Sequence, residues 1–171
     1  MKFRIVCAAL AVLLCLPALA LAQPQPESLQ LEVTRSVTTY SRYTVFDDVR
    51  AHIDGRTVTL SGKVTLPVKK DDIGKRVAAL HGVTAVRNEI EVLPPLRSDD
   101  ELRHRVGRAI YSNAAFWRYA AMSTPPIRIL VDRGRVTLTG LVANESDRML
   151  ARSLATGLGE TTLSCELRTE R

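Results

Sequence analysis

Hydrophobic and polar residues alternate with a period of two in two stretches of the chain, residues 49–60 and residues 127–138. Each stretch is interrupted by a polar turn, Asp54-Gly55 in the first and Asp132-Arg133-Gly134 in the second. A period of two is typical of a strand with one buried face, and a short polar turn between two such strands is typical of a hairpin. The pattern therefore predicts an antiparallel β-hairpin that occurs twice in the chain.

The two hairpins match most closely around a glycine. DGRTVTLSGKV, residues 54–64, and DRGRVTLTGLV, residues 132–142, share six identical positions without a gap. Gly62 and Gly140 stand in register where the second strand should end or bend. We expect a bulge or a close backbone approach at each glycine, with no room for a side chain.

After each glycine the apolar spacing changes to three and four residues, which predicts an amphipathic helix. The apolar positions are Ile73, Val77 and Leu80 in the first copy, and Leu150 and Leu154 in the second. Ile73 and Val77 match the two leucines at a distance of 77 positions, one fewer than the 78 that relate the hairpins. The missing residue is expected in the loop after the glycine, where a deletion is tolerated best.

The two helices are expected to begin near Asp71 and Asn144 and to end before Gly82 and Gly159. The pair Asp71-Asp72 could be read as two catalytic carboxylates. At a helix start it is better interpreted as compensation of the helix dipole, because negative charge is favourable at that end.

A further helix and a further strand complete each copy. Residues 29–37 carry apolar residues at helical spacing, and residues 102–110 do the same after an acidic start at residues 99–101. Residues 86–90 and 163–167 alternate again and predict a last strand in each copy.

The order of elements predicts an α+β fold made of two α-β-β-α-β units, each with a three-stranded mixed sheet packed against two helices. The first unit is expected at residues 29–93 and the second at residues 99–170, joined by a linker at residues 94–98 that begins with Pro94-Pro95. Units of this size are only marginally stable alone, so two modules could shield each other or present two copies of one binding surface.

The first 22 residues have the pattern of a secretory signal peptide. Lys2 and Arg4 precede an apolar run, and the small-residue pattern Ala20-Leu21-Ala22 predicts cleavage after Ala22, leaving a short tail at residues 23–28. The apolar run is shorter than the roughly 20 residues that span a bilayer. We therefore expect a periplasmic or secreted protein rather than one anchored in the membrane.

Cleavage would remove two basic residues and lower the formal net charge from +6 to +4. Export excludes nucleic acid as the usual partner of a basic protein and leaves anionic lipid, acidic glycans or acidic proteins. Of the three cysteines only Cys165 would remain, so no disulfide could form within the mature chain. Cys165 lies between two leucines of the last strand and is expected to pack as a small core hydrophobe.

The chain resembles the BON domain family of bacterial osmotically inducible and nodulation proteins. The resemblance rests on VTLSGKV and VTLTGLV with their glycines, on HGVTAVRNEIEV in the first unit, and on YTVFDDVRAHIDG leading into the first hairpin. It implies the α-β-β-α-β fold, a periplasmic or envelope location, no catalytic site, and a role in phospholipid binding or in envelope stability under osmotic stress. The second unit departs from the pattern, with GETTLSC from Gly159 where GVTAVRN is expected.

No catalytic, cofactor or metal site is predicted. His52, His81 and His104 have no partner at catalytic or metal-ligand spacing and are interpreted as structural or exposed. The chain contains no P-loop, zinc motif or nucleophile elbow. Gly62, Gly82, Gly140 and Gly159 are interpreted as structural glycines.

The stretch DDELRHRVGRAIYSNAAFWRYAAM, residues 99–122, is the candidate functional surface. Arg105 and Arg108 fall away from the apolar stripe of the predicted helix, and Phe116, Trp117 and Tyr119 cluster after it. Basic residues beside interfacial aromatics suit an anionic membrane surface. The alternative is that these aromatics fill the interface between the units.

Two function classes remain open from sequence. The first is a non-catalytic module that makes peripheral contact with anionic phospholipid or the cell envelope. The second is a periplasmic adaptor that binds envelope proteins through sheet edges or the aromatic patch, without lipid affinity.

Overall fold

The computed structural model describes residues 26–158 and 162–170. The expected signal peptide at residues 1–22 and the expected structural glycine Gly159 lie outside the described residues.

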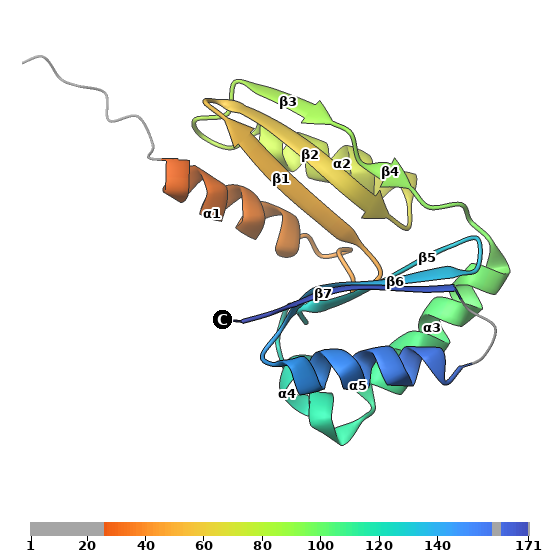
Figure 1. Ribbon diagram of the computed structural model, residues 1–171. Helices are drawn as coiled ribbons and strands as arrows, with labels where there is room; N and C mark the ends of the chain where they lie inside the picture. The colour runs from red at the N-terminus through yellow and green to blue at the C-terminus, as the bar shows by residue number, and fades with distance from the viewer. Residues whose placement is uncertain (1–25, 159–161, 171) are drawn as a thin grey trace, which may run out of the picture.

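The first unit contains two helices and a mixed sheet (Figure 1). Its elements are α1 (Pro26–Thr38), β1 (Asp48–Asp54), β2 (Thr57–Val64), α2 (Pro67–Ala78), β3 (Ala85–Asn88) and β4 (Glu91–Val92). The last strand of the sheet is split into β3 and β4, and both pieces pair with β2 in parallel. Helices α1 and α2 pack on this sheet through apolar residues such as Val33, Ile73 and Val77, which are fully buried.

The second unit repeats this arrangement with two short helical turns inserted after its first helix. Its elements are α3 (Arg97–Tyr111), the 3₁₀ turn η1 (Ala114–Phe116), α4 (Trp117–Ala120), β5 (Ile127–Asp132), β6 (Arg135–Val142), α5 (Glu145–Thr156) and β7 (Thr162–Thr169). Strand β6 lies in the centre of its sheet, antiparallel to β5 and parallel to β7. The α+β class and the two repeated α-β-β-α-β units predicted from sequence are confirmed.

Both repeated glycines lie where the two strands of a hairpin approach each other closely. Gly62 has a φ of +114° and Gly140 a φ of +117°. A Cβ atom would stand 2.1 Å from the Asp48 carbonyl oxygen at Gly62 and 1.9 Å from the Pro126 carbonyl oxygen at Gly140. The predicted close approach is therefore present, although β2 and β6 each continue for two residues beyond the glycine.

Helix α2 begins earlier than the sequence predicted. It starts at Pro67, with Leu66 as N-cap, so Asp71 and Asp72 lie inside the helix and not at its positive end. The interpretation of this pair as dipole compensation is wrong: Asp71 is exposed, and Asp72 accepts a 2.6 Å hydrogen bond from the Tyr40 hydroxyl. Proline at the first helical turn was the signal that marks this start.

The buried face of α5 also differs from the expected one. Asp147, Ala151 and Ala155 are its buried residues, whereas Leu150 and Leu154 are half-buried and pack against the edge of the core. The buried positions of α2 and α5 are therefore 78 residues apart, as in the hairpins. The residue missing from the second copy falls after the helix, since the last strands are related by 77 positions.

Helices α2 and α5 each carry a buried charged residue at the equivalent position, and the two charges are opposite in sign. Lys69 of α2 is 4% exposed, and its Nζ lies 2.6 Å from the carboxylate of the fully buried Asp47. At the matching position of α5, Asp147 accepts hydrogen bonds from the Tyr119 hydroxyl and from Arg118. Each unit thus pairs its buried helix charge with a group that precedes its own first strand.

The segment before β1 docks the first unit onto the second. The amide of Ile129 in β5 donates a 2.8 Å hydrogen bond to the carbonyl oxygen of Val45. Phe46 packs against the core of the second unit, with its ring 5.0 Å from that of His104 in an edge-to-face contact. This docking explains why β5 has almost no exposed residue, because both of its faces are covered.

Charged side chains complete the docking contact. The Arg128 guanidinium lies 4.8 Å from the centre of the Tyr43 ring and donates to the Thr44 carbonyl oxygen. Lys63 Nζ lies 2.9 Å from Asp132 Oδ2, which raises the pKa of Lys63 and lowers that of Asp132. The sheet of the second unit is therefore placed between the first unit and helices α3 and α5 (Figure 1).

Candidate functional site: the outer face of helix α3

Helix α3 is strongly amphipathic, with one buried apolar face and one charged face. Leu102, Val106 and Ile110 form the inner stripe and are buried in the second core. The spacing of four residues places them on one side of the helix. The opposite side is charged and points away from the first unit, which lies across the sheet (Figure 1).

The start of α3 lies at Arg97, two residues before the acidic start expected from sequence. Asp99 is 1% exposed, and its carboxylate accepts hydrogen bonds from the amides of Arg133 and Gly134. Asp99 therefore fixes the β5–β6 turn in addition to placing negative charge in the first turn of the helix.

Two basic residues on the outer face of α3 are free of ionic partners. Arg105 and Arg108 are exposed, and neither side chain forms an ion pair or hydrogen bond with any residue of the described ranges 26–158 and 162–170. By contrast, Arg97 pairs with Glu101, four residues later, and Arg103 pairs with Asp100. The unpaired positive charge of α3 is thus concentrated at Arg105 and Arg108.

These arginines border an open depression of about 470 Å³, which is also lined by Ala109, Ser112 and the half-buried Leu158. The depression is shallow, and among the described residues that line it none is charged besides these two arginines. It offers cationic guanidinium groups around an apolar floor.

The structure divides the aromatic cluster that follows α3. Phe116 is fully buried and Tyr119 is 7% exposed, whereas Trp117 is 67% exposed. Phe116 and Tyr119 belong to the core of the second unit, so they are neither surface groups nor an interface between the units. The prediction that they contribute to a binding surface is wrong in this respect, because the short turns η1 and α4 point these two rings inward.

Tyr119 is held by hydrogen bonds at the start of α5. Its hydroxyl donates to Asp147 at 2.6 Å and accepts from the Ala143 amide at 2.7 Å, and the Arg118 guanidinium lies 4.7 Å from the ring centre. Burial, and then the hydrogen bond to Asp147, raise the pKa of the Tyr119 phenol above its ordinary value. Tyr119 therefore fastens α4 to the rest of the unit and leaves Trp117 projecting.

The groups that could perform chemistry are dispersed. His52 and His81 are exposed, and His104 is exposed beside Phe46. Among the described residues there is no group of three histidine, cysteine or acidic side chains that could hold a metal ion. Cys165 is half-buried and packs against the second core.

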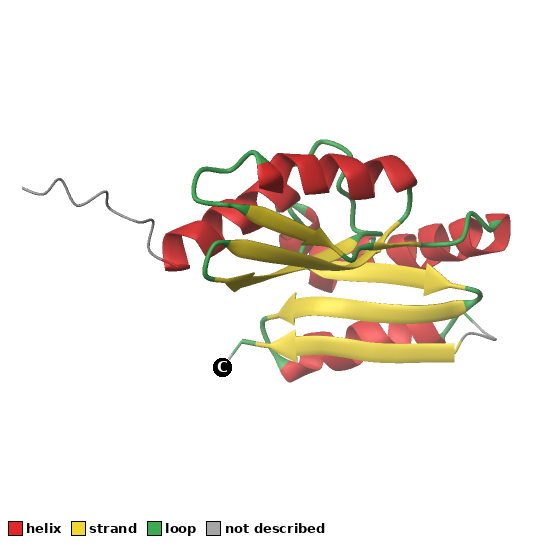
Figure 2. Ribbon diagram, turned by 90° about the horizontal axis from the view of Figure 1, so that it is seen from above, coloured by secondary structure: helices red, strands yellow, loops and turns green. Residues whose placement is uncertain are grey.

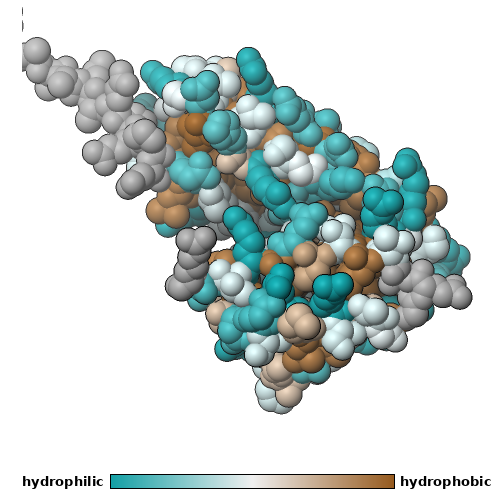
Figure 3. Space-filling view, in the orientation of Figure 1, coloured by the Kyte–Doolittle hydropathy of each residue, from teal (hydrophilic) through white to brown (hydrophobic). Residues whose placement is uncertain are grey.

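No helix within the described ranges is both long and apolar enough to cross a membrane. Exposed apolar side chains are scattered, including Trp117, Met122 and Met149. On the face shown in Figure 3, hydrophilic residues separate small apolar patches, so any membrane contact through this face would be superficial.

A two-helix, three-stranded unit that occurs twice, with a glycine at each hairpin crossing, defines a tandem α+β module. The model of the BON domain matches the chain twice, at residues 30–94 and 98–160, and the chain belongs to the BON domain family. Proteins of this family are generally non-catalytic binding modules, typically periplasmic or envelope-associated, and they are associated with phospholipid binding and with envelope or osmotic stress roles.

Two solved structures of CdsD, a structural protein of the type III secretion system of Chlamydia trachomatis, are similar to the chain at 14% and 13% identity. Their TM-scores are 0.33 and 0.31, and the alignments cover 83% and 82% of this chain. The chain spans only about three fifths of those chains, 61% and 63%. Among curated proteins no sequence matches the chain.

Proposed function

We propose that the protein is a non-catalytic module of the cell envelope that binds anionic phospholipid at the membrane surface and supports envelope integrity or osmotic stress tolerance. The observation that carries this proposal is the unpaired charge of Arg105 and Arg108 on a helix face that the first unit does not cover. The projecting side chain of Trp117, the first residue of α4, is suited to headgroup depth. The signal peptide pattern of residues 1–22 and the typical location of the family support the envelope as the place of action.

The expected binding is electrostatic and weak for a single site. An arginine near an anionic leaflet contributes about 1 kcal/mol, and the attraction falls off within a Debye length of about 10 Å at 0.1 M salt. The mature protein should therefore bind vesicles rich in anionic phospholipid at low salt and release them as salt is raised. It should not bind neutral vesicles measurably.

The decisive variant is Arg105→Glu/Arg108→Glu. It should weaken binding to anionic vesicles at least about 30-fold in cosedimentation, which corresponds to about 2 kcal/mol for the two arginines. The matched control is Arg35→Glu/Arg87→Glu, which changes two exposed arginines of the first unit by the same charge. The control should keep most of the affinity. Equal losses in both variants would show that net charge alone drives binding, and the proposal would then be wrong.

A second candidate function is a protein adaptor without lipid affinity. The observation that favours it is β7, an eight-residue strand at the edge of its sheet that pairs only with β6 among the described strands. Such an edge can accept an added strand from a partner. Absence of any binding to anionic vesicles by the unaltered protein would favour this candidate.

A further inference from the structure

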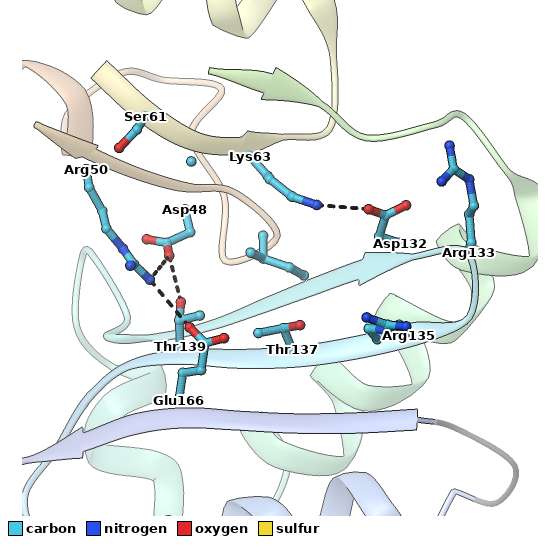
Figure 4. Close-up of a pocket in the computed structure, with 12 residues that line it drawn as sticks. Asp48, Arg50, Ser61, Lys63, Asp132, Arg133, Arg135, Thr137, Thr139 and Glu166 are labelled. Carbon is cyan, nitrogen blue, oxygen red and sulfur yellow. Dashed lines mark hydrogen bonds and ion pairs between the residues drawn. The ribbon is translucent and has the colours of Figure 1, made fainter. Parts of the chain in front are cut away.

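A polar cleft of about 530 Å³ lies between the two units. One wall comes from β1 and β2 of the first unit, and the other comes from the helix-free face of the second sheet (Figure 4). Figure 2 shows the two sheets meeting in this region, with the helices of the second unit behind its sheet. The volume falls within the range of about 300–1,000 Å³ that is typical of small-ligand sites.

Both ends of the cleft are closed by contacts between the units. At one end Lys63 pairs with Asp132 at 2.9 Å. At the other end Asp48 accepts a 2.9 Å hydrogen bond from the Thr139 hydroxyl and pairs with Arg50, which in turn lies 3.9 Å from Glu166. These contacts fix the separation of the walls, so the cleft is preformed as long as the units are docked.

Two exposed arginines, Arg133 in the β5–β6 turn and Arg135 at the start of β6, line the cleft without forming an ion pair. The side chains of Arg133 and Arg135 form no ion pair or hydrogen bond with another residue of the part of the chain that the structure describes. The backbone of Arg133 is held by two hydrogen bonds, from its own amide and that of Gly134, to the buried Asp99. These hydrogen bonds hold the turn in place, and the two guanidinium groups lie beside the Lys63–Asp132 pair.

The lining favours a phosphate group over a carboxylate. Guanidinium groups bind phosphate oxygens with parallel hydrogen bonds, and the Thr137 hydroxyl adds a donor beside Arg135. Ser61 lies at the opposite end of the cleft, near Arg50 (Figure 4). A tetrahedral phosphate can use donors from several directions, whereas a carboxylate is planar. Thr137 lies between the arginine end and the Glu166 end of the cleft (Figure 4).

The size and polarity of the cleft indicate a ligand that is larger than a free phosphate ion and that lacks the acyl chains of a lipid. A water molecule has a share of about 30 Å³ in the liquid, so a phosphate ion alone would leave most of the cleft empty. Acyl chains would have no apolar wall, since Leu130 is the one large apolar side chain in the lining. The exposed carboxylate of Glu166 at the far end can accept hydrogen bonds from hydroxyl groups.

We propose that the cleft between the two units binds a small water-soluble phosphorylated polyol, with the phosphate on Arg133 and Arg135 and the hydroxyl groups toward Thr137 and Glu166. This site is separate from the outer face of α3. A ligand that contacts both walls would also hold the two units together, because it would bind only their docked arrangement.

The test is a titration of the full mature protein followed by backbone amide shifts in NMR. The probes are glycerol 3-phosphate, inorganic phosphate, glycerol, and vesicles of anionic phospholipid. Glycerol 3-phosphate should cause saturable shifts at Ser61 and Thr137, and it should bind at least about tenfold more tightly than inorganic phosphate or glycerol. Saturation at Ser61 and Thr137 by the vesicles would instead assign the cleft to a lipid headgroup and overturn the proposal.

The matched variant is Arg133→Asn/Arg135→Gln. Position 133 has a φ of +50°, which asparagine tolerates well, so the turn should keep its conformation. This variant should unfold at the same temperature as the unaltered protein and lose at least about tenfold in affinity for glycerol 3-phosphate. The α3 variant Arg105→Glu/Arg108→Glu should bind glycerol 3-phosphate normally, which separates this site from the lipid surface.

Three further results would overturn the proposal. The first is the absence of saturable shifts with glycerol 3-phosphate, and the second is equal affinity in the variant at positions 133 and 135. The third is equal affinity for inorganic phosphate, which would mean an anion site without recognition of the polyol.

Discussion

Replacement of Gly140 by alanine is expected to destabilise the second unit by about 3 kcal/mol or more. A Cβ at this position would stand 1.9 Å from the Pro126 carbonyl oxygen, and the φ of +117° is unfavourable for any other residue. The hairpin would have to open to relieve the contact, and that would break the pairing of β5 with β6. Gly62→Ala should have the same effect on the first unit, where the corresponding distance is 2.1 Å.

The matched control is Gly134→Ala in the turn of the same hairpin. Gly134 also has a positive φ, +77°, but no atom lies within 4 Å of its Cβ position. This variant should lose only about 1–2 kcal/mol, the cost of a left-handed conformation. Urea denaturation followed by circular dichroism measures the difference. Equal midpoints for Gly140→Ala and Gly134→Ala would show that the close backbone approach is not what requires glycine.

Removal of the Asp47 carboxylate is expected to cost about 3–5 kcal/mol in the first unit. Asp47 is fully buried and accepts hydrogen bonds from the amides of Thr44 and Thr65 as well as from Lys69. Lys69 is only 4% exposed, and in Asp47→Ala its buried ammonium would lose its counter-charge. A buried charge without a partner lowers the free energy of unfolding far more than replacement of that charged residue by an apolar one.

Two comparisons isolate this effect. Asp54→Ala removes an exposed carboxylate at the end of β1 and should change the free energy of unfolding by less than about 0.5 kcal/mol. The double variant Asp47→Ala/Lys69→Met removes both charges and should be more stable than Asp47→Ala alone. If the double variant were the less stable one, the buried pair would not be the reason for the loss.

The elements that the sequence predicted well are those with a long and regular apolar period. The hairpins at residues 48–64 and 127–142 follow a period of two over both strands, and their repetition made the prediction stronger. The inner stripe of α3, from Leu102 to Ile110, follows the helical period over more than two turns. In these elements the local pattern and the tertiary contacts favour the same conformation.

The start of α2 was misplaced because a charged residue stands on its buried face. Lys69 belongs to the apolar side of the helix in space but interrupts the apolar pattern in sequence, so the helix became recognisable only from Ile73. Its burial depends on Asp47, which lies 22 residues earlier, and no local pattern reports such a pair.

The candidate surface could be predicted only in part. The outward direction of Arg105 and Arg108 follows from the helical period of α3. The short turns after α3 have no such period, so the sequence could not show which aromatic rings point into the core and which point outward. Phe116 and Tyr119 are buried for tertiary reasons, among them the hydrogen bond from Tyr119 to Asp147 in α5. The cleft between the units depends on docking through Val45 and Phe46, which the sequence did not indicate.

Trp117, the single tryptophan of the chain, gives the most direct measurement of the proposed membrane contact. Its side chain is 67% exposed, so its fluorescence emission should be typical of a ring in water. On addition of anionic phospholipid vesicles at low salt, the emission should shift to shorter wavelength, and the shift should be lost in Arg105→Glu/Arg108→Glu and reversed by salt. Cosedimentation with these vesicles without any shift of the Trp117 emission would contradict the account, because the protein would then contact the membrane through another surface.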